Sequence, residues 1–81
     1  MSPAAVKEMA ILSQRDRDSL VAKAEAFASD PVAPHPWASP LRGMADRIRI
    51  RQGNFRGIML ILRSQETVVL ERVAHRREVY R

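Results

Sequence analysis

Three arginines alternate with two isoleucines in the segment Arg47-Ile48-Arg49-Ile50-Arg51. Because successive side chains of a β-strand point to opposite faces, this alternation predicts a half-buried strand with all three arginines on one face. Like charges on one strand face repel one another and do not stabilise a fold. The row is more simply explained by an anion that binds across it, and we interpret this anion as an RNA backbone.

The positive charge is concentrated in the second half of the chain. Of the net charge of +5, residues 1–41 contribute −1, and residues 42–81 contribute +6 from ten arginines and no lysine against four acids. The exclusive use of arginine in this half favours phosphate as a ligand, since the guanidinium group offers a rigid fork of donors and stays charged when partly desolvated. A solvated basic surface on a small protein is an equally good explanation of the charge alone.

The length of 81 residues allows one small domain, which we expect to span residues 1–81. The chain has no cysteine, which excludes disulfides and thiolate metal sites, and its two histidines, His35 and His75, are too isolated to indicate a metal. We expect no cofactor. The N-terminus lacks the pattern of a signal peptide, and the longest apolar stretch, residues 58–62, is too short to cross a bilayer. A cytoplasmic protein without a membrane segment is expected.

Helical signals precede the alternating segment. Ser2-Pro3 is typical of a helix start and predicts a short helix to about Leu12. Ser13 can cap a second helix, with Asp16 three residues on, and this helix is expected to end at Ser29. Its apolar stripe consists of Leu20, Val21, Ala24, Phe27 and Ala28. We therefore expect a helical hairpin over about residues 3–29.

A proline-rich connector is expected over residues 30–41, extended and irregular, with Trp37 as its anchor and His35 as an exposed loop residue. The pattern of residues 46–74 predicts an antiparallel meander of three strands, and residues 75–81 are expected to form a basic tail. Two helices followed by three strands indicate an α+β domain. In such a domain the helices pack on one sheet face and leave the opposite face to the arginines.

A family resemblance rests on several motifs in a fixed order after the helical hairpin. They are Leu41-Arg42-Gly43, Arg49-Ile50-Arg51, Gly53-Asn54-Phe55-Arg56, Val68-Val69-Leu70 and His75-Arg76-Arg77-Glu78-Val79-Tyr80-Arg81. In this order the chain resembles, over nearly its whole length, the RelE/ParE superfamily of bacterial toxins. The resemblance implies a toxin that a cognate antitoxin neutralises. In the RelE branch such toxins cleave messenger RNA in the ribosomal decoding site, whereas the ParE branch targets DNA gyrase.

The resemblance also implies site residues. Arg49 and Arg51 match two basic residues on the strand after the hairpin, Arg56 matches the arginine of the next strand, and Arg76 and Tyr80 match C-terminal positions. We expect Arg56 and Arg76 to clamp the scissile phosphate, and Arg49 with Arg51 to orient the ribose 2′-hydroxyl and the backbone. Tyr80 would stack on a base.

Four further residues are expected to bind RNA: Arg47, His75, Arg77 and Arg81. An arginine is a poor general base because its pKa exceeds about 12. If a side chain takes the proton of the 2′-hydroxyl, the candidates are His75 and Glu78. The choice between them stays open, since the ribosome or the RNA itself can also supply a base.

Members of the superfamily usually open with a β-strand before the helical hairpin, and this strand is missing here. Either the coding sequence starts further upstream, or the shortened sheet exposes an edge that another chain covers, in a homodimer or a toxin–antitoxin hetero-oligomer. A third alternative is a decayed, inactive copy.

The function implied by the RelE branch is that of a metal-independent, ribosome-dependent mRNA endoribonuclease that inhibits translation. Its partners would be a cognate antitoxin, the ribosome and mRNA. Two alternatives remain at this stage. One is a ParE-like gyrase inhibitor without nuclease chemistry, and the other is an RNA-binding protein without catalysis, whose affinity would fall steeply with salt while no product forms.

Overall fold

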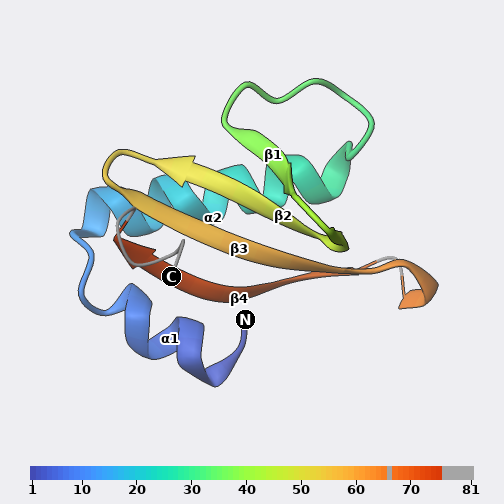
Figure 1. Cartoon of the computed structure of the whole chain (residues 1–81). Helices are drawn as coiled ribbons and strands as arrows, with labels where there is room; N and C mark the ends of the chain where they lie inside the picture. Colours follow the sequence, from blue (N-terminus) through green and yellow to red (C-terminus); the bar gives the residue numbers. More distant parts are fainter. Residues whose placement is uncertain (66, 76–81) are drawn as a thin grey trace.

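The computed structural model describes residues 1–65 and 67–75. Within these residues two helices precede four strands, which form one antiparallel sheet in the order β1-β2-β3-β4 (Figure 1). The elements are α1 (Pro3–Met9), α2 (Gln14–Ser29), β1 (Ala38–Leu41), β2 (Met44–Gln52), β3 (Phe55–Leu62), a 3₁₀ turn (Arg63–Gln65) and β4 (Thr67–His75). The predicted α+β class, with both helices packed on an antiparallel sheet, is confirmed.

Both helices begin at the predicted serine caps. The hydroxyl of Ser2 accepts the backbone N–H of Ala5 at 3.1 Å, and the hydroxyl of Ser13 accepts that of Asp16 at 3.2 Å. These caps satisfy N–H groups that have no partner inside the helix. Helix α1 ends at Met9, three residues earlier than predicted, because the chain must become extended at Ser13 to cap α2.

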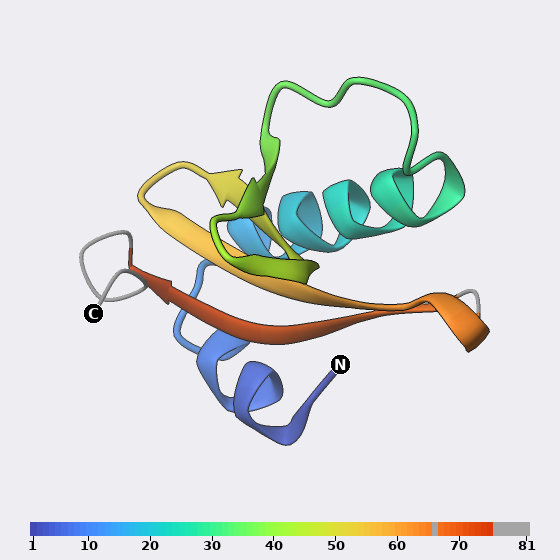
Figure 2. The ribbon, with the colours of Figure 1, turned by 45° about the vertical axis from the view of Figure 1, so that its right-hand side comes forward.

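The connector differs from its prediction at its end. Residues 38–41 form strand β1, which pairs with β2, so the described sheet has four strands where the sequence predicted three. Proline is compatible with this strand because β1 lies at the edge of the sheet, where Pro40 does not have to donate a ladder hydrogen bond. The rest of the connector arches from the end of α2 to β1 (Figure 2).

One core lies between the helices and the sheet. Its largest fully buried side chains are Leu20 of α2, Ile50 of β2, Met59 of β3 and Val73 of β4, each at most 1% exposed. Gly57 of β3 allows the side chains of Leu20 and Leu70 to approach the backbone of β3 closely. A Cβ atom at this position would stand 3.1 Å from Cδ1 of Leu70 and 3.2 Å from Cδ1 of Leu20.

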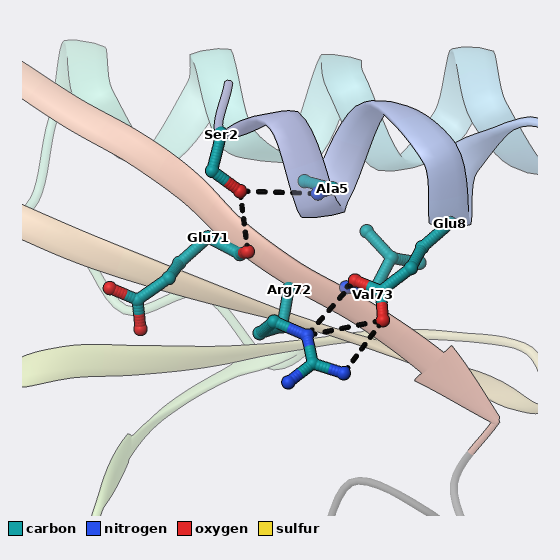
Figure 3. A network of polar contacts seen from close by, with 6 residues as sticks. All are labelled: Ser2, Ala5, Glu8, Glu71, Arg72 and Val73. Atoms are coloured by element: carbon teal, nitrogen blue, oxygen red, sulfur yellow. Dashed lines mark hydrogen bonds and ion pairs between the residues drawn. The ribbon is translucent and has the colours of Figure 1, made fainter.

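Within the described residues, the outer edge of β4 is bound by α1 and its N-cap residue Ser2 (Figures 1 and 3). The backbone N–H of Ser2 donates to the carbonyl oxygen of Leu70 at 2.9 Å, and the Ser2 hydroxyl donates to that of Glu71 at 2.6 Å. The carboxylate of Glu8 accepts the backbone N–H of Val73 at 2.8 Å and pairs with the guanidinium of Arg72. Between Leu70 and Val73, residues of the same chain therefore supply partners to this edge of the sheet.

The tight turn between β2 and β3 depends on a glycine with positive φ. Gly53 has φ 55°, a conformation that costs other L-residues roughly 1–2 kcal/mol. Gly53→Ala should therefore lower the free energy of unfolding by about 1–2 kcal/mol, measured by urea denaturation. Gly53→Asn is the matched control and should lose less, because asparagine tolerates the left-handed region. Equal losses for the two variants would contradict this explanation.

The Glu8 contacts predict a pH dependence of stability. The hydrogen bond from Arg72, and in addition the one from Val73, lowers the pKa of Glu8 below its ordinary value of 4.5. A lowered folded-state pKa means that the ionised form stabilises the fold above about pH 4.5 and that this contribution disappears as the pH falls through the folded-state pKa. Glu8→Gln should therefore be less stable than the wild type at pH 7, with a difference that shrinks in acid. Urea denaturation across this range tests the expectation, and a difference independent of pH would contradict it.

Candidate nucleic-acid interface

The arginines of β2 and β3 lie on the sheet face that points away from the helices, which we call the arginine face. Residues directly opposite in an antiparallel pair share a face. Ile50 is paired with Gly57 on the core side, so the neighbouring pairs, Arg51 with Arg56 and Arg49 with Ile58, lie on the other side. The register thus brings two predicted site residues, Arg51 and Arg56, directly opposite each other.

Arg47 is neutralised by a carboxylate that the sequence analysis did not identify. Its Nε and Nη2 atoms donate to the two carboxylate oxygens of Glu71 at 3.1 and 3.2 Å. Glu71 reaches this face at a β-bulge, since Ile58 is paired with Arg72 and the next residue, Met59, with Leu70. The pairing reduces the charge that Arg47 can offer to an anion.

Arg49, Arg51 and Arg56 each donate to neutral oxygens of neighbouring residues. Nη2 of Arg49 donates to the hydroxyl of Ser39 on β1 at 2.9 Å, and Nη2 of Arg51 donates to the carbonyl oxygen of Pro36 at 3.3 Å. Nη1 of Arg56 donates to the carbonyl oxygens of Gly53 and Phe55 at 2.9 and 2.7 Å. Bonds of this kind orient a guanidinium group and leave its charge in place, so Arg51 and Arg56 present two positive charges on opposed residues of this face, and their donors suit an anion such as phosphate.

His75 lies on the opposite side of the sheet from this pair. It is paired in register with Phe55, and their rings meet edge to face with centroids 5.9 Å apart. Phe55 packs against the core, so His75 shares the core face and not the arginine face. The other predicted site residues of the tail, Arg76, Arg77, Glu78, Tyr80 and Arg81, lie outside the described residues.

A lysine that the sequence analysis did not single out lies beside Arg51. Nζ of Lys23 on α2 donates to the backbone carbonyl of Arg51 at 2.8 Å and to the side-chain oxygen of Gln52 at 2.7 Å. Burial lowers the pKa of Lys23, and the positive charge of Arg51 lowers it further. No sequence pattern marks Lys23, because the contact joins α2 to the end of β2, 28 residues away.

The described part of the chain shows no cluster of three or more His, Cys, Asp or Glu side chains that could hold a metal ion. None of its helices combines the length and the apolar character that crossing a membrane requires.

The fold is similar to that of chains in solved toxin–antitoxin complexes. A chain of the RelB–RelE antitoxin–toxin complex from Methanococcus jannaschii matches with a TM-score of 0.75 and 20% identity, over 98% of this chain and 92% of that chain. A chain of the RelBE2 toxin–antitoxin complex from Mycobacterium tuberculosis matches with a TM-score of 0.70 and 26% identity, over 91% of this chain and 90% of that chain. No protein-family model and no curated protein matches the sequence. The chain therefore has the RelE-like α+β fold that the resemblance implied.

Proposed function

We propose that this chain, which has the RelE-like fold, is the toxin of a toxin–antitoxin pair and an endoribonuclease that cleaves mRNA on the ribosome. The fold supports the toxin assignment, since both neighbours named above come from toxin–antitoxin complexes. The observation that carries the nuclease assignment is the cross-strand pair Arg51 and Arg56 on the face that points away from the helices. Two like charges held directly opposite each other destabilise a sheet unless an anion binds between them.

The proposed reaction is an internal transfer at phosphorus. The ribose 2′-oxygen loses its proton and forms a bond to phosphorus, while the bond from phosphorus to the 5′-oxygen breaks and this oxygen gains a proton. Negative charge on the phosphate oxygens increases in the transition state, and preorganised donors stabilise it. Arg56 and Arg51 take this role, with Arg49 orienting the RNA backbone. These steps need no metal ion as a reactant.

The placement of His75 narrows the choice of general base. A base must lie within about 2.6–3.2 Å of the proton it removes, and His75 lies on the other side of the sheet from Arg51 and Arg56. We therefore keep Glu78, the ribosome and the RNA as the candidate sources of the base. Arg76 and Tyr80 keep their proposed roles in the phosphate clamp and in base stacking, and Arg77 and Arg81 theirs in RNA binding.

The test is induced expression of the chain in bacteria with mapping of mRNA 5′ ends. We expect growth arrest and new cleavage sites in translated mRNA, and we expect both to disappear in Arg51→Ala/Arg56→Ala. Arg76→Ala/Tyr80→Ala tests the tail in the same way. Arrest without cleavage would overturn the nuclease proposal in favour of a gyrase inhibitor, and absence of arrest with a folded protein would indicate a decayed toxin.

A further inference from the structure

The connector holds two aromatic rings in a fixed stack next to Arg51. The rings of His35 and Trp37 lie with centroids 4.7 Å apart and planes inclined by 33°, and Phe27 of α2 lies against His35 at 5.9 Å. A hydrogen bond between Nε2 of His35 and the carbonyl oxygen of Asp30, 2.8 Å long, fixes the imidazole ring. His35 and Trp37 are each half-buried, Trp37 packs against the core, and the flanking prolines restrict the backbone that carries the two rings.

Two cationic side chains lie near this aromatic pair. Nζ of Lys23 lies 6.0 Å from the centroid of the Trp37 ring, while the backbone N–H of Arg51 donates to the carbonyl oxygen of Trp37 at 2.8 Å. The guanidinium of Arg51 donates to the carbonyl oxygen of Pro36, between the two aromatic residues. Lys23 and Arg51 therefore lie beside the same rings, although their like charges repel each other.

Aromatic rings beside cations are the combination by which proteins bind single-stranded nucleic acid, because bases stack on the rings while the cations bind the phosphates. Arg51 connects this combination to the arginine face, because its side chain lies on that face by register while its guanidinium donates to the connector at Pro36. From this juxtaposition we infer that His35, Trp37 and Lys23 form a second nucleotide subsite for single-stranded RNA. One base stacks on the aromatic pair, and the adjoining phosphate binds Lys23 and Arg51. The inference rests on the proposed function as an RNA-binding toxin and extends its site beyond the arginines.

Trp37 is the only tryptophan in the chain, so its fluorescence reports directly on this subsite. The probe is a short oligoadenylate with 2′-O-methyl groups, which cannot undergo internal transfer, and the control is an abasic strand of equal length. We expect the oligoadenylate to quench Trp37 in parallel with the rise in anisotropy of a labelled copy of the strand. The abasic strand should bind through its phosphates and leave the fluorescence unchanged.

Variants separate the contribution of base stacking to RNA affinity from that of phosphate binding. His35→Ala should weaken binding of the oligoadenylate by about 5- to 150-fold, the range found when a stacking ring is removed. Lys23→Ala should reduce the slope of log affinity against log salt by about 0.7, whereas Lys7→Ala, an exposed lysine on α1, should leave it unchanged. Circular dichroism of each variant confirms that the fold is intact.

Each remaining outcome overturns the inference. If the oligoadenylate binds without quenching Trp37, or if the abasic strand quenches equally, no base stacks at this position, and the proposed function is unaffected. If neither strand binds to the wild type, the inference fails together with RNA binding by the isolated chain. The expression experiment then decides separately whether the chain is a nuclease.

Discussion

Arg56→Ala is expected to lower the rate of ribosome-dependent mRNA cleavage by about 30- to 900-fold. This factor corresponds to a loss of about 2–4 kcal/mol of transition-state stabilisation, the range typical of a donor removed from a developing oxyanion. The side chain is well placed for this role because two backbone carbonyls fix its guanidinium group and Arg51 lies directly opposite. Single-turnover cleavage on programmed ribosomes, with toxin in excess, measures the rate separately from binding.

Two variants make this test specific. Arg42 is exposed in the turn between β1 and β2, so Arg42→Ala removes the same charge elsewhere and should change the rate by less than about 3-fold, as expected for a screened surface charge. Arg56→Lys keeps the charge and loses the fork of donors, so it should recover only part of the rate. If Arg56→Ala weakens ribosome binding as much as it slows cleavage, the arginines bind RNA without catalysing its cleavage.

The sequence predicted the parts of the fold that local patterns determine. Serine caps fixed the starts of both helices, and the alternation of arginine with isoleucine fixed the two faces of β2. Strand β1 was missed because four prolines near it resemble a connector, and only its pairing with β2 shows that the end of the segment is a strand. Local composition cannot predict such a pairing, since both strands contribute to it.

The sequence predicted which residue types form the candidate site, but only part of how these residues are arranged in space. Arg51 and Arg56 were named from the sequence, but their direct opposition follows from the two-residue turn at Gly53 and Asn54. The neutralisation of Arg47 depends on a bulge in β4 that no local signal marks, and the contact of Lys23 with Arg51 joins elements far apart in the chain. His75 was expected to bind RNA because it was grouped with the tail that follows it. It is instead the last residue of β4, and its pairing with Phe55 determines the face on which its side chain lies.

The two sides of the sheet have different physical roles. The core side carries small and apolar residues whose close packing stabilises the domain, while on the arginine face Arg51 and Arg56 place like charges opposite each other, which opposes folding until an anion binds. The core side and the α1 contacts along β4 must offset this repulsion. Binding of RNA to the arginine face should in turn stabilise the fold, because a ligand that binds only the folded state shifts the unfolding equilibrium.

Leu20→Ala is expected to lower the free energy of unfolding by about 2–5 kcal/mol, the range for truncating a buried leucine. Leu20 is fully buried and lies over Gly57, in the space that a side chain on β3 would occupy. A domain of this size has a stability of roughly 4–12 kcal/mol, so this loss is a large part of the total. Ile11→Ala is the matched control, because Ile11 is 80% exposed and its truncation should change stability by less than about 0.5 kcal/mol.

A double-mutant cycle shows whether Leu20 and Gly57 contribute to stability through the same close packing. Gly57→Ala alone should be destabilising, because its Cβ would crowd Cδ1 of Leu20 and Cδ1 of Leu70. In the Leu20→Ala background the same methyl group enters the space that the leucine has left, so its effect should become smaller or change sign. Urea denaturation of the four proteins gives the coupling free energy. Additive effects of the two substitutions would show that Leu20 and Gly57 do not share one packing site.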